Sequence, residues 1–110
     1  MSHTLYRLET KLIHSGEPKP RIQGAISMPI FQSATFEYKG EASYNHLKYL
    51  RLSNTPNHIA LHQKLVALET GEAALVTSSG MAAISATLLS CLHTGDHLLA
   101  QDCLYGGPMG

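Results

Sequence analysis

The sequence predicts an α/β protein of which these residues form the opening part. Two observations predict it: helix and strand patterns alternate in the second half of the chain, and the apolar residues of the helical segments recur at helical spacing. A third observation sets the first half apart, because its periodicity is poor. With 110 residues, 44% of them hydrophobic, the composition is that of a globular protein.

Residues 1–57 are predicted to form an N-terminal arm. A short amphipathic helix over residues 5–13, capped by Thr4, opens this segment. The apolar side chains of residues 25–36 are too numerous for a disordered segment. Because a compact domain rarely holds an irregular stretch of about 40 residues, the arm is expected to wrap a partner subunit. Four prolines interrupt any long helix here: Pro18, Pro20, Pro29 and Pro56.

Residues 58–110 are predicted to begin an α/β domain. The first helix runs from a cap at Asn57 to about Thr70, and Gly71 terminates it. A buried strand over residues 73–77, a helix over 81–93 and a strand over 97–101 then form a βαβ unit with a right-handed crossover. Since these elements are too few to cover both faces of a parallel sheet, the domain is expected to be incomplete.

Charge and hydropathy exclude several classes of partner. The formal net charge is 0, which gives no electrostatic case for nucleic acid or an anionic membrane. The apolar runs are far shorter than the roughly 20 residues that a membrane span requires. The first residues lack the features of a secretory signal, so we expect a cytoplasmic protein.

The cysteines and histidines give no metal site. Cys91 and Cys103 lack the spacing of a zinc knuckle, and Cys91 is expected to be a small buried hydrophobe. His58 and His62 stand four apart and share a helix face. Without a third ligand at metal spacing, a solvated helix face is the favoured interpretation.

The loops that follow the two predicted strands are the candidate binding site, because ligands of open α/β sheets bind beyond the carboxyl ends of the strands. After the first strand, Ser79, Gly80 and Met81 begin a helix whose free N–H groups suit a phosphate. An ordinary helix cap without a ligand is the alternative. After the second strand, Tyr105 either stacks on a flat ligand or packs at the surface.

A second candidate lies in the arm. Tyr49 and Arg51 are two apart, so on an extended chain they point the same way and offer a phenol and a guanidinium to a phosphate. A solvated loop with one salt bridge is the alternative interpretation.

Six motifs follow one another along the chain: Ile13-His14-Ser15-Gly16, Pro29-Ile30-Phe31-Gln32-Ser33-Ala34-Thr35-Phe36, Tyr49-x-Arg51, Leu75-Val76-Thr77-Ser78-Ser79-Gly80-Met81-Ala82-Ala83-Ile84, Gly95-Asp96-His97 and Tyr105-Gly106-Gly107. Taken in this order, they resemble the Cys/Met-metabolism family of pyridoxal-phosphate (PLP) enzymes, which includes cystathionine γ-synthase, the cystathionine lyases and methionine γ-lyase. The likeness covers essentially the whole chain but only the N-terminal part of a family member.

The resemblance implies the PLP-binding domain of the type I aminotransferase-like fold, with PLP as cofactor. Ser79, Gly80 and Met81 would bind the cofactor phosphate, and Tyr105 would stack on the pyridine ring and assist proton transfer. Tyr49 and Arg51 would reach the phosphate in the neighbouring subunit, so that Tyr49 joins Tyr105 in a shared active site. The family is typically a homotetramer, a dimer of dimers.

The implied activity is that of a lyase or transferase in transsulfuration: β- or γ-elimination or γ-replacement on cysteine, cystathionine, methionine or O-acylhomoserine substrates. The chain departs from the family pattern at Ser53, where a G-N-P-T motif is usual, and at Pro108. No lysine here matches the family's Schiff-base lysine, so the isolated chain is expected to be inactive. Because half of the chain is an arm and the βαβ unit leaves an open sheet edge, the isolated chain is also expected to be partly unfolded or prone to aggregation. A non-catalytic phosphate-binding, PLP-binding or oligomerisation remnant is the alternative.

Overall fold

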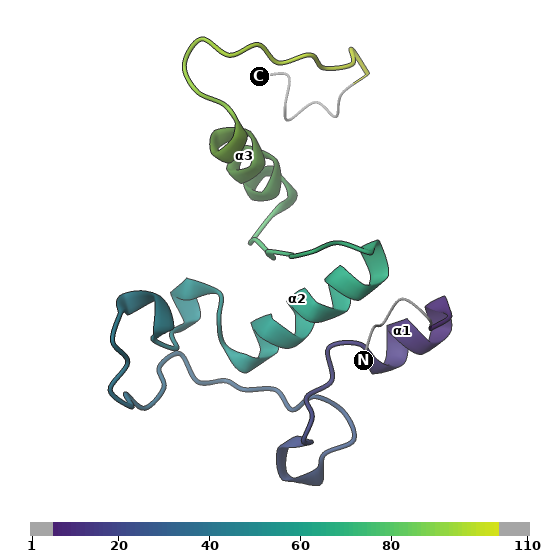
Figure 1. Ribbon diagram of the computed structural model, residues 1–110, viewed down its shortest axis with the longest axis vertical. Helices are drawn as coiled ribbons and strands as arrows, with labels where there is room; N and C mark the ends of the chain where they lie inside the picture. The colour runs from purple at the N-terminus through teal and green to yellow at the C-terminus, as the bar shows by residue number, and fades with distance from the viewer. Residues whose placement is uncertain (1–5, 104–110) are drawn as a thin grey trace. The chain divides into compact units, whose positions relative to one another are not determined.

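Helices and short 3-10 turns make up the regular structure of residues 6–103, the part of the chain that the computed structural model describes (Figure 1). The chain divides into two compact units after Val76, and each unit is described by itself. Among the described residues, no helix has the length and apolar character that crossing a membrane requires. The elements are α1 (Leu8–His14), η2 (Ile22–Gly24), η3 (Tyr44–His46), η4 (Leu50–Leu52), α2 (Pro56–Glu69) and α3 (Gly80–Cys91).

The first unit is organised by the packing of α1 against α2 (Figure 1). Gly16, just after α1, has φ +77°, a left-handed conformation that favours glycine. A Cβ on Gly16 would lie 2.1 Å from the carbonyl oxygen of Ala60 on α2. The chain can therefore pass this close to α2 only because residue 16 has no side chain.

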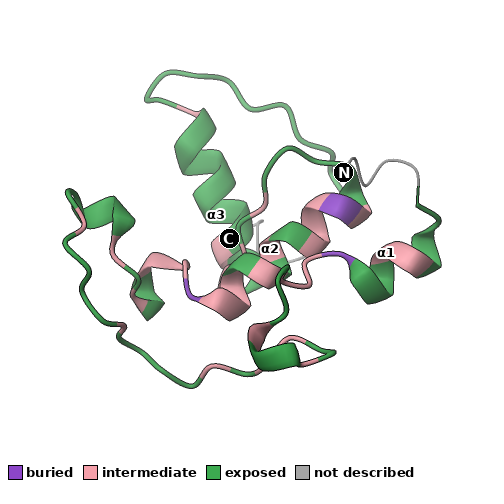
Figure 2. Cartoon of the chain, turned by 60° about the horizontal axis from the view of Figure 1, so that its bottom comes forward, coloured by how far each residue is buried: buried purple, intermediate pink, exposed green. Residues whose placement is uncertain are grey.

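The core of this unit is small. Ala67 on α2 is the buried hydrophobic residue among residues 6–103, and the buried polar residues are Ser15 and Thr55 (Figure 2). Ser15 adjoins Gly16, and Thr55 precedes α2. Burial in the first unit therefore concentrates along α2 and at the two chain segments that lie against it.

Both predicted helices of this unit are confirmed, with shifted ends. The first is α1, which begins after Arg7; the predicted cap, Thr4, lies outside the described residues. The second is α2, whose cap is Thr55 because Pro56 occupies the first helical position. The helix ends at Glu69, and Thr70, in the left-handed conformation, terminates it in place of the predicted Gly71.

The predicted strands over residues 73–77 and 97–101 are wrong for this structure, and the βαβ unit that they define is not formed. A strand needs a neighbour to accept its N–H groups. The N–H of Val76 instead donates to the His62 ring at 3.1 Å. Within residues 6–103, the β-bridge found is an isolated antiparallel one between Thr35 and Tyr49.

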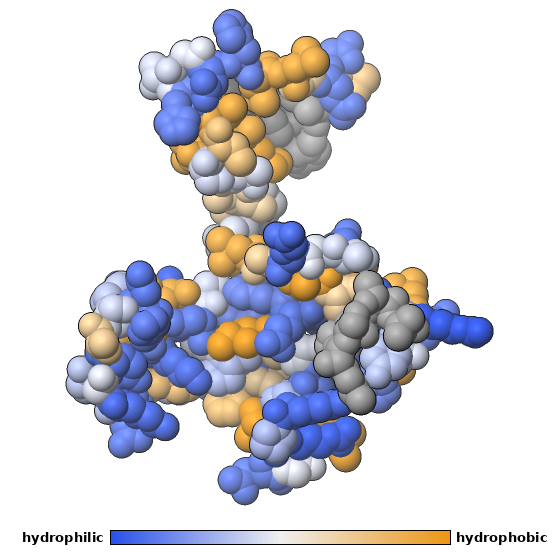
Figure 3. All heavy atoms as spheres, viewed as in Figure 1, coloured by the Kyte–Doolittle hydropathy of each residue, from blue (hydrophilic) through white to orange (hydrophobic). Residues whose placement is uncertain are grey.

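The second unit contains α3, which confirms the helix predicted between the two strands. After α3 a turn closes through the carboxylate of Asp96, which accepts the N–H of His93 at 2.7 Å. No residue over 77–103 is buried, and hydrophobic side chains of this unit lie at the surface (Figure 3). Cys91, expected to be buried, is exposed, because nothing among these residues packs on its side of α3. Four large apolar side chains of α3 are exposed: Met81, Ile84, Leu88 and Leu89.

Candidate functional site

The start of α3 holds the first group of predicted site residues. Ser79 has extended backbone angles and caps the helix, its Oγ accepting the N–H of Ala82 at 3.1 Å. Thr77 Oγ1 donates to the carbonyl of Ser79 at 2.8 Å, which fixes the residue from the other side. The first N–H with an intrahelical acceptor is that of Ala83, which donates to the carbonyl of Ser79 at 3.1 Å. The N–H groups of Gly80 and Met81 come before it in the helix, so they remain available to a ligand.

The surroundings of Gly80 fit an anion at this position. A Cβ added to Gly80 would meet no atom within 4 Å, so the packing of the described residues does not require a glycine here. The open space lies beside two N–H groups at the positive end of a helix. Ser79 accepts one hydrogen bond, and its hydroxyl proton is free to be donated to a phosphate oxygen. The residues present therefore fit a phosphate group.

Tyr49 and Arg51 form the second group, in the first unit. The guanidinium carbon of Arg51 lies 5.7 Å from the centre of the Tyr49 ring, within cation–π range. The two side chains lie together, as predicted, but the predicted extended chain is wrong. Arg51 lies in the 3-10 turn η4, and this turn brings the side chains together. Arg51 is exposed and makes no ion pair with any described residue.

Asn54, which sequence reasoning missed, holds the backbone beneath this pair. Its Oδ1 accepts the N–H of Tyr49 at 3.0 Å, and its Nδ2 donates to the carbonyl of Leu47. Before it, Ser53 has φ +53°, and its buried hydroxyl oxygen has no hydrogen-bond partner. Ser53 stands where the resemblance led us to expect glycine, and a left-handed φ is the reason that glycine suits the position.

Asn57 uses its carboxamide in the same way on another part of the arm. Its Oδ1 accepts the N–H of Phe31 and its Nδ2 donates to the carbonyl of Pro29, both at 2.7 Å. The prediction that Asn57 caps α2 is therefore wrong. Thr55 precedes α2, and Asn57 lies inside its first turn.

The structure brings together Ser79, Gly80 and Met81 in one unit and Tyr49 and Arg51 in the other. Tyr105 lies outside the described residues. The role of each of these residues therefore remains a prediction.

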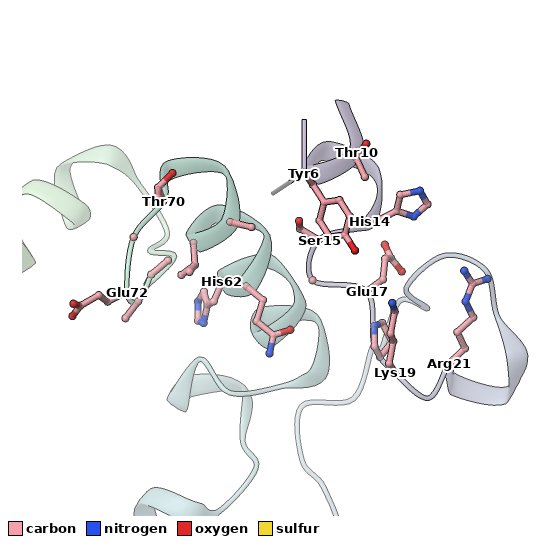
Figure 4. A pocket seen from close by; sticks show the side chains of 18 residues that line it. Tyr6, Thr10, His14, Ser15, Glu17, Lys19, Arg21, His62, Thr70 and Glu72 are labelled. Carbon is pink, nitrogen blue, oxygen red and sulfur yellow. The ribbon is translucent and has the colours of Figure 1, made fainter. Parts of the chain in front are cut away.

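A separate cleft of about 1030 Å³ lies within the first unit, between α1 with its following loop on one side and α2 with residues 70–74 on the other (Figure 4). None of the predicted site residues lines it. At its edge, Lys64 and Glu17 form an ion pair at 3.9 Å, which links α2 to the loop after α1.

His58 and His62 share a face of α2, as predicted, with ring centres 6.2 Å apart. Each ring has a structural partner: His58 Nδ1 lies 2.7 Å from Thr55 Oγ1, and His62 Nε2 accepts the N–H of Val76. Among residues 6–103, no three histidine, cysteine or acidic side chains gather as a metal site would require. The two rings therefore hold the segments on either side of α2, at Thr55 before it and at Val76 after it.

The contact of His62 predicts a pH-dependent stability. Burial, and then the charge of His58, lower the pKa of His62 below its ordinary value of 6.5. The unfolded chain therefore binds more protons, so the contribution is fully present above pH 6.5 and is lost as pH falls through the lowered pKa. Protonated His62 can no longer accept the N–H of Val76.

We expect His62→Gln to flatten this part of the pH profile, because glutamine accepts a hydrogen bond without titrating. The measurement is the free energy of unfolding between about pH 7.5 and about pH 5, the range in which histidine changes charge. The exposed His97 provides the matched control, His97→Gln. An unchanged slope in His62→Gln contradicts the prediction.

Comparison with known proteins gives one consistent group. The sequence profile described as "Cys/Met metabolism PLP-dependent enzyme" matches residues 9–109. An L-methionine gamma-lyase of Fusobacterium nucleatum subsp. polymorphum is 43% identical, over 92% of this chain and 27% of the relative. A probable cystathionine gamma-synthase of Herpetosiphon aurantiacus is 38% identical, over 93% and 31%. A cystathionine beta-lyase of Lactococcus lactis subsp. cremoris is 39% identical, over 91% and 26%. The chain thus spans between a quarter and a third of the length of these relatives.

Proposed function

This chain belongs to the family of Cys/Met metabolism PLP-dependent enzymes, and we propose that it is the N-terminal part of a lyase or transferase of sulfur amino acids. The family match over residues 9–109 carries the proposal. The relatives are named for γ-elimination, β-elimination and γ-synthase chemistry, so the proposal extends to the class and not to one reaction. By itself the chain is proposed to be inactive.

The family's cofactor is pyridoxal 5′-phosphate, which when bound supplies an electron sink for carbanions of amino acids. The chain's contribution is to hold the phosphate. The N–H groups of Gly80 and Met81 and the hydroxyl of Ser79 would donate to it, at the positive end of α3. The capping of α3 by Ser79 supports this role, because it fixes the direction of those donors.

Tyr49 and Arg51 are proposed to bind the cofactor phosphate of a neighbouring subunit, with residues 1–57 as an intersubunit arm. The exposure of Arg51 supports this, since its charge is available to an outside group. Residues 58–110 would open the PLP-binding domain, and Tyr105 would stack on the cofactor ring and assist proton transfer. The active protein is proposed to be a cytoplasmic homotetramer.

A hybrid enzyme tests the proposal: this chain replaces the matching 27% of the Fusobacterium L-methionine gamma-lyase. We expect the hybrid to bind PLP, measured by its absorbance, and to show γ-lyase activity on L-methionine. Arg51→Ala in the hybrid should weaken PLP binding about tenfold or more, because a charge-assisted contact to phosphate is lost.

Arg21→Ala is the matched control, because Arg21 is an exposed arginine of the same unit that belongs to neither phosphate group. It should leave the affinity for PLP unchanged. A folded hybrid that fails to bind PLP contradicts the proposal. If Arg51→Ala and Arg21→Ala changed the affinity for PLP equally, the proposed role of the arm in binding the phosphate would be contradicted.

A further inference from the structure

The carboxamide of Asn54 spans the backbone from Leu47 to Tyr49. The N–H of Tyr49 can only donate and the carbonyl of Leu47 can only accept, so the contacts fix which side-chain atom is Oδ1 and which is Nδ2. The side chain thus presents an acceptor and a donor side by side, as the peptide group of a neighbouring strand does. For residues 47–49, Asn54 thus makes the two hydrogen bonds that a neighbouring strand would make.

The other edge of the same backbone is held by Ala34 and Thr35. Tyr49 pairs with Thr35 in the antiparallel bridge, and the N–H of Leu50 donates to the carbonyl of Ala34 at 3.0 Å. Tyr49 is therefore held from two sides, by backbone on one and by Asn54 on the other. Removal of the Asn54 side chain leaves a single support.

Residues 49–54 form a loop that begins at Tyr49, carries Arg51 and returns to Tyr49 through the side chain of Asn54. The N–H of Leu52 donates to the carbonyl of Tyr49 at 3.0 Å, and this bond closes the 3-10 turn that carries Arg51. The left-handed backbone of Ser53 then turns the chain, and the Asn54 side chain reaches back to Tyr49. The loop therefore sets the backbone positions of Tyr49 and Arg51, and with them the contact of the guanidinium with the Tyr49 ring.

We propose that Asn54 is a positioning residue for the phosphate-binding pair of Tyr49 and Arg51, an inference that rests on the proposed function. Asn54 contacts the backbone and not the phosphate. Aspartate at this position keeps the size and the acceptor but loses the donor, and it sets a carboxylate against the carbonyl of Leu47. Asn54→Asp therefore releases the turn with a minimal change of shape.

Two NMR measurements on the 110-residue chain test this inference. The first is a through-hydrogen-bond scalar coupling between the amide nitrogen of Tyr49 and the carboxamide carbon of Asn54, which we expect to observe. The second is a titration with inorganic phosphate, followed at the Tyr49 amide and the Arg51 side chain. We expect Asn54→Asp and the neutral variant Asn54→Ala each to weaken this binding about tenfold, since both groups lose their fixed position. Weakening by Asn54→Asp alone would show repulsion between the new carboxylate and phosphate, and would overturn the inference. Signals of Gly80 and Met81 report separately on the other phosphate group.

Asn57→Ala is the control that separates positioning from general stabilisation. Its carboxamide bonds to Pro29 and Phe31 and does not touch Tyr49, so it should leave phosphate binding at Arg51 within about twofold. Equal weakening by Asn54→Asp and Asn57→Ala, including weakening through loss of the fold, overturns the inference. Absence of the Tyr49–Asn54 coupling in the unsubstituted chain also overturns it.

Arg51→Ala distinguishes this inference from the proposed function. If Arg51→Ala leaves phosphate binding at Tyr49 unchanged, the phosphate role of the arm fails, and the positioning role fails with it. If Arg51→Ala weakens binding and Asn54→Asp does not, only the positioning role is overturned.

Discussion

Gly16→Ala is expected to disrupt the packing of α1 on α2. The new Cβ would lie 2.1 Å from the carbonyl oxygen of Ala60 and 3.1 Å from the amide nitrogen of Lys64, both of them helix backbone. Neither atom can move without distorting α2, so α1 and its loop must move away. We expect a loss of about 3 kcal/mol in the free energy of unfolding beyond the cost of backbone strain.

Gly24→Ala provides a closely matched control for this prediction. Gly24 has the same φ of +77° as Gly16, but a Cβ there would meet nothing within 4 Å. The backbone strain is common to both variants, at about 1–2 kcal/mol. Urea unfolding followed by circular dichroism measures the difference, and equal destabilisation of the two variants contradicts the prediction.

Asn57→Ala is expected to detach the extended segment at Pro29 and Phe31 from α2. Two opposing effects decide its size. Loss of both hydrogen bonds leaves a partly buried N–H and carbonyl without partners, at a cost of about 1–3 kcal/mol. Alanine also has the higher helix propensity, a gain of about 0.7 kcal/mol or less. We expect a net destabilisation of about 2 kcal/mol by the same urea measurement.

Two further variants sharpen the test of Asn57. Asn57→Asp keeps the acceptor for the N–H of Phe31 and loses the donor to the carbonyl of Pro29, so its effect should be intermediate. Asn45→Ala removes an exposed asparagine of the same unit and should change stability by less than about 0.5 kcal/mol. A smaller effect for Asn57→Ala than for Asn45→Ala would refute the role of the carboxamide.

The helices could be predicted from the sequence because their signals are local. Apolar spacing, the proline at position 56 and the turn near residue 70 act within one or two helical turns of the residues that they affect. The strands could not be predicted in the same way, because a strand forms only beside another. At Val76 the histidine ring of α2 accepts the hydrogen bond that a neighbouring strand would take, and no spacing pattern encodes that exchange.

The candidate site residues could be proposed from the sequence, and their roles stay predictions. The residue types at Ser79, Gly80 and Arg51 suggest a phosphate by their chemistry alone. The asparagine contacts were missed: Asn54 hydrogen-bonds to residues 5 and 7 positions before it, and Asn57, outside the site, to residues 26 and 28 positions before it. The prediction that Cys91 is buried was wrong, because the apolar character of a residue does not show whether a neighbouring element covers its face of the helix.

The division of the chain after Val76 has a consequence for its synthesis. Every long-range contact described for the first unit joins residues that precede Thr77. These contacts are the side-chain hydrogen bonds of Asn54 and Asn57, the close approach of Gly16 to Ala60, and the bond from Val76 to His62. A ribosome synthesises the N-terminal segments first, and units can form as they emerge. The arm, with Tyr49 and Arg51 already held in place, can therefore assemble before the start of α3 has left the ribosome.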